Sequence, residues 1–299
     1  MIGVELLETG AVAVAIEGDG RVLARATAAA GTAAIEQLAM APDAPIGIAA
    51  ATPDAAGVAE AIEAIRRRYP SVTLHSVISS GTAAALAETW VGAARGAHDV
   101  AYFGVAEHAV AGLVRGGVPV TGSRGRAASV AWLALNPVER EDYRRVGCLE
   151  AEVAGPGIVR RLVWRIKAGD HSCVQDDVGG DLSAITVDHV LHAARGGDGV
   201  SISVMRDTAK YLGMAAANLA VVFDPEVLVL GGVMAGAADL LLEPVRGEIG
   251  RRLPRPMNDA LTIAPALLGA DAASIGAARL ASPAGPGGAP AARPARGRG

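Results

Sequence analysis

Aromatic residues are scarce in this sequence, at 3% of 299 residues, and positive charge is not in excess. Lys and Arg number 27 against 31 Asp and Glu, so the formal net charge at pH 7 is −4. A nucleic-acid partner needs a basic face for its phosphates and, when it is single-stranded, aromatic side chains for its bases. We therefore expect no nucleic-acid partner.

Cysteine is also rare, and its two occurrences, Cys148 and Cys173, cannot form the disulfide framework of a secreted protein of this length. Two thiols suit a reducing compartment, where they behave as small buried side chains. The start of the chain, Met1–Glu5, lacks the basic segment that opens a signal peptide. No apolar run approaches the roughly 20 residues that cross a membrane. These absences predict a cytoplasmic protein with no membrane partner.

Hydrophobic residues are abundant, at 51%, and their spacing changes between strand and helix periods along the chain. Strands are expected over Gly3–Ile16, Arg21–Ala26, Pro45–Ala50, Val72–Val77, Val100–Val105, Ala109–Val114, Val118–Gly122, Val221–Leu230 and Leu261–Pro265. Helices are expected over Ala55–Arg68, Gly81–Ala94, Leu149–Ala168, Thr186–Ala194, Val200–Ala220, Asp239–Leu253 and Ala272–Ala281. Each half opens with strands and continues with helices, which predicts a duplicated α/β architecture.

The composition changes near the C-terminus. Residues 282–299 are mostly Pro, Gly, Ala and Arg, with no large apolar side chain, so we expect this tail to be disordered. The rest of the chain is expected to divide into a shortened N-terminal α/β domain over residues 1–98 and a C-terminal α/β domain over residues 99–281.

Several segments share the pattern of one protein family. An apolar run ends in a Gly-Gly turn in Asp224–Gly232, and it follows Ile185–Asp198 and Tyr211–Leu219 in the family's order and spacing. Gly92–Val100 and Gly147–Glu150 add two shorter matches. Together these segments resemble the ROK family (repressor, open reading frame, kinase), whose enzymes phosphorylate sugars with ATP. The resemblance implies an actin-like ATPase fold of the ribonuclease H-like type, with two α/β domains around a cleft, and a dimer.

The two phosphate loops of that family are replaced in this sequence. Where the family has Asp-x-Gly-Gly-Thr-Lys, residues 5–10 keep the carboxylate of Glu5 and the hydroxyl of Thr9 but lose the glycine pair. Where the family has Ser-Thr-Gly-Ile-Gly, residues 106–110 hold Glu107 and His108. Glycine lets a backbone approach phosphates closely, and added carboxylates repel them. The replacements predict that ATP with Mg²⁺ is a disfavoured cofactor.

The family's catalytic base and zinc ligands are replaced as well. Ser80 stands where the family has the Asp that takes the proton of the sugar hydroxyl, and a serine has no comparable basicity. Capping of the helix that starts near Gly81, by Ser79 or Ser80, explains this serine without any chemistry. Trp132 replaces a zinc-binding and sugar-contacting His, and of the zinc-loop cysteines Cys148 remains. A zinc site needs four ligands, so we expect no zinc and no catalytic residue.

Three more positions match binding residues of the family. Glu150 matches a carboxylate that contacts the sugar, and its place at a helix start accounts for it about as well. Gly231 and Gly232 match a turn that lies against the adenosine, and strand-end geometry is an alternative explanation. The candidate ligand-binding residues are therefore Glu5, Thr9, Ser80, Glu107, His108, Glu150, Gly231 and Gly232.

Three hypotheses on function follow. The joint loss of base, phosphate loops and zinc predicts a catalytically inactive pseudokinase that binds a ligand or partner through the retained scaffold. The alternative is an active sugar kinase, or an enzyme with altered cleft chemistry that depends on Glu107 and His108. A transcriptional regulator is less favoured, because its DNA-binding module would precede a first strand that begins at residue 2. The expected partners are a second copy of the chain, a related protein in a hetero-oligomer, or a small molecule in the cleft.

Overall fold

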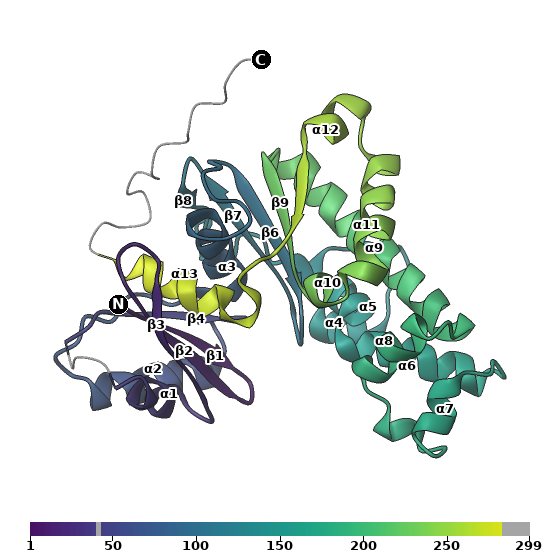
Figure 1. Ribbon diagram of the computed structural model, residues 1–299, viewed down its shortest axis with the longest axis horizontal. Coiled ribbons are helices and arrows are strands. Elements are labelled where there is room, and N and C mark those ends of the chain that lie inside the picture. Colours follow the sequence, from purple (N-terminus) through teal and green to yellow (C-terminus); the bar gives the residue numbers. More distant parts are fainter. Residues whose placement is uncertain (40–42, 283–299) are drawn as a thin grey trace.

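Two five-stranded sheets with helices packed on them make up the computed structural model, which describes residues 1–39 and 43–282 (Figure 1). The predicted disordered tail, residues 282–299, lies outside the described residues except for Ser282. The two-sheet α/β architecture predicted from the sequence is confirmed. None of the helices within the described residues has the length and apolar character needed to span a bilayer.

The first sheet has the order β3-β2-β1-β4-β5. Its strands are β1 (Ile2–Leu7), β2 (Gly10–Ile16), β3 (Val22–Ala28), β4 (Ile46–Ala50) and β5 (Ile78–Ser79). The outer face is covered by α1 (Gly31–Gln37) and α2 (Ala56–Arg68), because apolar residues of β1 such as Val4 and Leu6 pack toward them. Period-two alternation then turns Gly3 and Glu5 to the opposite face, where Gly3 lies against α13 (Ala272–Leu280).

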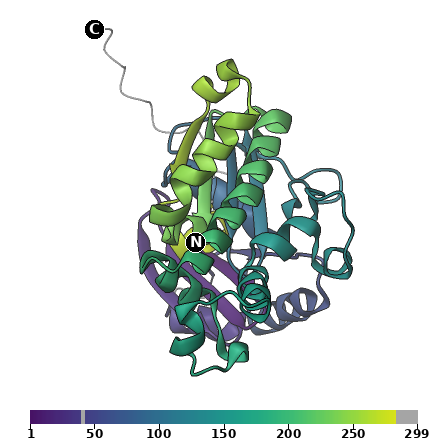
Figure 2. The same ribbon diagram turned by 90° about the vertical axis from the view of Figure 1, so that its right-hand side faces the viewer.

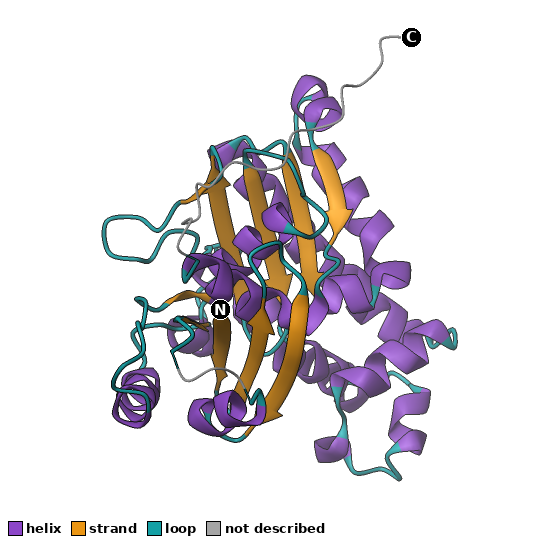
Figure 3. Cartoon of the chain, turned by 60° about the vertical axis from the view of Figure 1, so that its left-hand side comes forward, coloured by secondary structure: helices purple, strands orange, loops and turns teal. Residues whose placement is uncertain are grey.

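The second sheet has the order β10-β9-β6-β7-β8. Its strands are β6 (Val100–Val105), β7 (Ala109–Arg115), β8 (Val118–Pro119), β9 (Val227–Gly232) and β10 (Thr262–Pro265). The helices of this half are α4 (Glu141–Val146), α5 (Cys148–Val153), α6 (Gly155–Lys167), α7 (Cys173–Asp177), α8 (Val187–Arg195), α9 (Gly199–Phe223), α10 (Val233–Gly236), α11 (Ala238–Arg252) and α12 (Arg255–Ala260). Short 3₁₀ turns are η1 (Val130–Trp132), η2 (Leu182–Ala184) and η3 (Gly269–Asp271). Figures 2 and 3 show the long helices of this half on one face of the sheet, and Phe103, Leu212 and Leu228 join their shared core.

A pair of helices joins the two sheets. α3 (Ser80–Trp90) packs on β6 and β7, and α13 packs on β1, β2 and β4 as well as on α3. The approach is close enough that a side chain on Gly276 would lie 1.7 Å from the Ala83 carbonyl oxygen. On Gly47 it would lie 1.8 Å from the Ala277 carbonyl oxygen. Small residues at this junction therefore bring the two sheets together at the start of α3.

Two segments that were each expected to form one continuous element form two elements instead. Residues 3–16, expected as one strand, form β1 and β2, because the chain reverses through Glu8 and Thr9 and pairs Leu7 with Gly10. The helix expected over residues 149–168 divides into α5 and α6 at Ala154. Pro156 in the first turn of α6 lacks an N–H group, so it starts a helix and cannot continue the one before it.

Candidate active site

A cavity of about 450 Å³ lies at the carboxyl ends of β1 and β4. Its walls come from the β1–β2 turn, the chain after β4, and the starts of α1 and α2, and the β6–β7 turn of the other sheet contributes Glu107 and His108. In open α/β sheets the carboxyl ends of parallel strands are the usual place for a ligand, and this volume is typical of small-molecule sites. The cavity is the first candidate for a substrate site.

His108 connects both halves of the molecule at this cavity. Its Nε2 lies 3.2 Å from Glu8 Oε1 in the β1–β2 turn, and its Nδ1 lies 3.2 Å from Glu150 Oε1 on α5. Glu150 is buried, and its Oε2 accepts a hydrogen bond of 2.8 Å from the Ala109 N–H group. The hydrogen bond to Glu150 raises the pKa of His108, Glu8 adds to this, and partial burial opposes it. The imidazole is thus favoured in its protonated form between two carboxylates.

Replacing His108 with Asn is expected to lower the free energy of unfolding by about 0.2–1 kcal/mol at pH 6. Because folding raises the pKa of His108, the protonated imidazole contributes stability that is fully present below its unfolded value of about 6.5. That contribution is lost as pH rises through the folded pKa, so the variant and the parent should converge by about pH 9. Urea unfolding at the two pH values measures the difference. Equal losses at both would contradict the contribution of this ion-paired histidine.

A second polar group lies on the face of the first sheet opposite α1 and α2. Glu5 is largely buried there, which raises the pKa of its carboxyl group; the nearby Ser80 hydroxyl lowers it and the charge of Asp271 raises it further. Ser80 is the first residue of α3, and its buried Oγ forms no regular hydrogen bond. The helix is capped by Ser79, whose Oγ accepts the Thr82 N–H at 3.1 Å, so the predicted capping is confirmed for Ser79. The Ser80 hydroxyl therefore does not cap the helix, and it lies buried beside the Glu5 carboxylate.

Gly231 and Gly232 at the end of β9 are required by packing. A side chain on Gly231 would lie 2.1 Å from Tyr102 Oη, and one on Gly232 would lie 2.0 Å from the Val105 carbonyl oxygen. Gly232 also has a φ of +63°, which favours glycine. Burial raises the pKa of Tyr102, and the charges of Glu88 and Glu5 raise it further. Tyr102 thus lies near Glu5 and is a site residue that the sequence analysis did not identify.

The remaining predicted positions fall around these two groups. Thr9 is exposed in the β1–β2 turn, and Glu107 is exposed on the cavity wall. Cys148 is buried against Tyr143 and Ala151, as expected of a packed thiol. Within residues 1–39 and 43–282, no group of three or more His, Cys, Asp or Glu side chains is arranged to hold a metal ion. The structure therefore brings Glu8, His108 and Glu150 together and leaves Glu5 with Ser80.

Comparison with known proteins finds similarity to the ROK family both in the sequence and in the fold. The model of the ROK family matches residues 75–284. A glucokinase of Halalkalibacterium halodurans is 32% identical over 196 residues, which cover 64% of this chain and 59% of the glucokinase, less than two thirds of its length. The structure of a ROK glucokinase from Streptomyces griseus with glucose and AMPPNP superposes with a TM-score of 0.80 at 24% identity, over 94% of this chain and 98% of that one. A ROK hexokinase from Thermus thermophilus has a TM-score of 0.70 at 26% identity, over 93% and 96% of the two chains.

These similarities contradict the hypothesis of a catalytically inactive pseudokinase. The proteins that resemble this chain include glucokinases and a hexokinase, and nothing in the comparison indicates inactivity. The hypothesis inferred lost chemistry from replaced motif residues, one position at a time. Such a comparison does not register that Glu5 of β1 lies near Ser80 at the start of α3. The alternative hypothesis, an active enzyme, agrees better with these findings.

Proposed function

The chain belongs to the ROK family, and we propose that it is a sugar kinase of the glucokinase type, which transfers a phosphoryl group to a hexose hydroxyl. The observation that carries the proposal is the largely buried carboxylate of Glu5 beside the hydroxyl of Ser80 at the start of α3. A carboxylate next to this position supplies the basicity that Ser80 itself lacks. Glu5 is then the general base, and the Ser80 hydroxyl orients its carboxylate.

Glu150 is the proposed sugar anchor. It is buried, and its two oxygens are already oriented by Ala109 N–H and His108, so the carboxylate is held in one position before a ligand arrives. A preoriented carboxylate accepts hydrogen bonds from sugar hydroxyls with little further ordering. The similarity to glucokinases favours an unmodified hexose as the substrate.

The proposed phosphoryl donor is ATP with Mg²⁺, bound near the β1–β2 and β6–β7 turns. Glu8 and Glu107 on these turns would repel its phosphates, and two groups offset that repulsion. Because the pKa of His108 is raised, its protonated form would neutralise Glu8 through the contact at 3.2 Å, and a Mg²⁺ ion bound with ATP would offset part of the phosphate charge. Phosphoryl transfer depends mainly on positioning and charge, so turns without glycine pairs are compatible with a slow kinase.

A second candidate function is an enzyme whose acid–base pair is Glu107 and His108. The observation that favours it is the position of both side chains on the cavity wall, with His108 held between two carboxylates. Replacing Glu107 and His108 together by Gln and Asn distinguishes the two candidates. Loss of all turnover in this double variant, with Glu5→Gln remaining active, would favour the second.

The proposed function is tested by incubating the purified chain with Mg-ATP and a panel of hexoses and N-acetylhexosamines. Formation of a sugar phosphate, measured by mass spectrometry together with ADP release, is the expected result for at least one hexose. A lack of sugar phosphate from every sugar, with the protein folded, would overturn the proposal. The cytoplasmic location remains a proposal. The dimer or hetero-oligomer also remains a proposal, and native mass spectrometry tests it by measuring the mass of the assembly.

A further inference from the structure

The largest cavity described in the molecule, about 800 Å³, lies in the second half of the chain and shares no lining residue with the cavity at His108. It is bounded by α6 and α9, with the ends of other segments closing it. Five basic and three acidic side chains line it: Arg140, Arg161, Arg165, Lys210 and Arg252 against Glu152, Asp170 and Asp207. Basic side chains therefore exceed acidic ones by two among the lining residues, and one of the basic ones, Arg252, is paired with Glu248 outside the lining.

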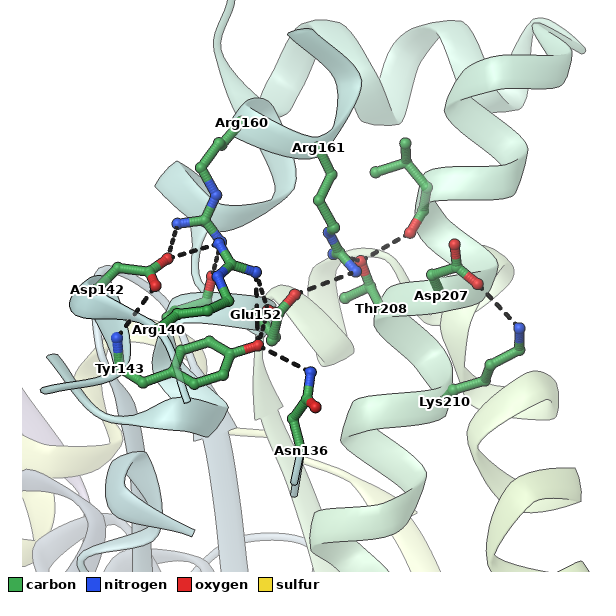
Figure 4. Close-up of polar contacts among 12 residues, drawn as sticks. Asn136, Arg140, Asp142, Tyr143, Glu152, Arg160, Arg161, Asp207, Thr208 and Lys210 are labelled. Carbon is green, nitrogen blue, oxygen red and sulfur yellow. Dashed lines mark hydrogen bonds and ion pairs between the residues drawn. The ribbon is translucent and has the colours of Figure 1, made fainter. Parts of the chain in front are cut away.

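Arg161 is the basic residue with the least complete set of partners. Its side chain is 13% exposed, and its Nε and Nη1 atoms are buried without a hydrogen-bond partner. Its Nη2 donates to Thr208 Oγ1, and the Glu152 carboxylate lies 4.0 Å from Nη1, beyond hydrogen-bond distance (Figure 4). A buried charged donor without an acceptor is costly, so an anion that accepts from Arg161 would relieve this cost.

Glu152 forms an ion pair with Arg161 but gives it no hydrogen bond, because the oxygen that faces Nη1 is Oε2, at 4.0 Å. It accepts hydrogen bonds from Arg140 and Tyr143 through Oε1, and Tyr143 is itself held by Asn136 (Figure 4). Asp207 pairs with Lys210 at 2.9 Å, and Asp170 pairs with Arg165 at 2.6 Å. Asp170 and Asp207 are thus committed to other partners, as is the Oε1 atom of Glu152.

One wall of the cavity is apolar. Trp164 is 51% exposed, and the guanidinium groups of Arg140 and Arg160 each lie 5.2 Å from its ring. These cations hold the indole in place, and the half-exposed ring lines the cavity together with Val204 and Met214 of α9. A ligand with a ring and an anionic group would contact both parts of the site.

We propose that this cavity binds an organic phosphate monoester of sugar-phosphate size, with its phosphate on Arg161 and its ring against Trp164. A phosphate monoester carries about −1.5 to −2 charges near pH 7, which suits a lining in which basic side chains exceed acidic ones. Arginine is suited to phosphate because its planar group donates two parallel hydrogen bonds. The cavity is also within the range of volumes that small-molecule sites have.

Calorimetric titration with glucose 6-phosphate tests the proposal. Binding is expected to the parent chain, with a dissociation constant at least about tenfold weaker for Arg161→Gln, because a hydrogen bond to a charged group is lost. Lys210→Gln at the exposed edge should weaken it severalfold. Arg206→Gln, an exposed cation on the same helix that does not line the cavity, should leave it unchanged. Thermal unfolding verifies that each variant is folded.

Four results would contradict the proposal. The first is that glucose 6-phosphate does not bind to the parent chain. The second is that it binds equally to the parent and to both cavity variants but not to Glu150→Gln, which would place the ligand in the cleft. Inorganic phosphate that binds as tightly as glucose 6-phosphate would reject the organic part of the ligand. A dimer that Trp164→Asp dissociates, together with no phosphate binding, would assign this face to a second copy of the chain. The readout is binding, so it does not depend on kinase activity.

Discussion

Replacing Glu5 with Gln is expected to lower kcat for hexose phosphorylation by about 100- to 10,000-fold, with a small change in sugar KM. The physical reason is that Gln keeps the size of the side chain and removes the carboxylate that accepts a proton beside Ser80. Since burial raises the pKa of Glu5, kcat of the parent should also fall as pH decreases, with an inflection above 4.5. Steady-state kinetics from about pH 5 to 8 measure both effects.

Moving the carboxylate provides the control for this prediction. Adding Ser80→Asp to the Glu5→Gln variant restores a base at the start of α3 and should recover part of the lost kcat. An exposed carboxylate on α2, Glu63, changed to Gln, should leave kcat within about twofold. If Glu5→Gln retains full activity while the parent phosphorylates sugar, Glu5 is not the base, and the proposed kinase function still stands.

The sequence predicted the two-sheet architecture because strand periods and buried apolar runs are local signals. The strands observed at Ile46–Ala50 and Thr262–Pro265 lie within a residue or two of their expected bounds. The prediction failed where one residue decides a boundary. The strand expected from Val221 begins at Val227, because α9 continues to Phe223 and ends at Asp224, which has a left-handed φ of +52°. Val221 and Val222 suit the end of a helix as well as the start of a strand, so the periodicity of apolar residues could not distinguish the two conformations.

The sequence predicted which residues belong to the candidate site, but it did not predict which of them contact one another. Glu5, His108 and Glu150 were identified as candidates from their alignment with known motifs, but the grouping depends on where three separate segments meet. Period two in β1 turns Glu5 away from Glu8, and no sequence pattern shows which of the two meets His108. Tyr102 was missed because its relation to Glu5 crosses between the two sheets. If β1 had been assigned as a strand that ends in a turn at Glu8, its period of two would have placed Glu5 and Glu8 on different sides of the sheet.

The assignment of sugar binding to Glu150 can be separated from its contact with His108. Glu8 and Glu150 both lie 3.2 Å from the imidazole, but Glu8 is 72% exposed and Glu150 is buried. If Glu150 contacts the sugar directly, its charge matters for affinity. If it only orients His108, the two carboxylates should be equivalent in their effect on substrate.

Replacing Glu150 with Gln is therefore expected to raise the sugar KM about 10- to 100-fold, because a charge-assisted hydrogen bond contributes roughly 1.5–3 kcal/mol. Glu8→Gln, the matched control, should change it by less than about threefold. The side-chain amide that Glu150→Gln introduces can still accept from the Ala109 N–H group, so the melting temperature should change little in either variant. Equal KM changes in the two variants would show that His108 orientation dominates. A change confined to Glu150→Gln places the sugar against α5, on the opposite side of His108 from the β1–β2 turn.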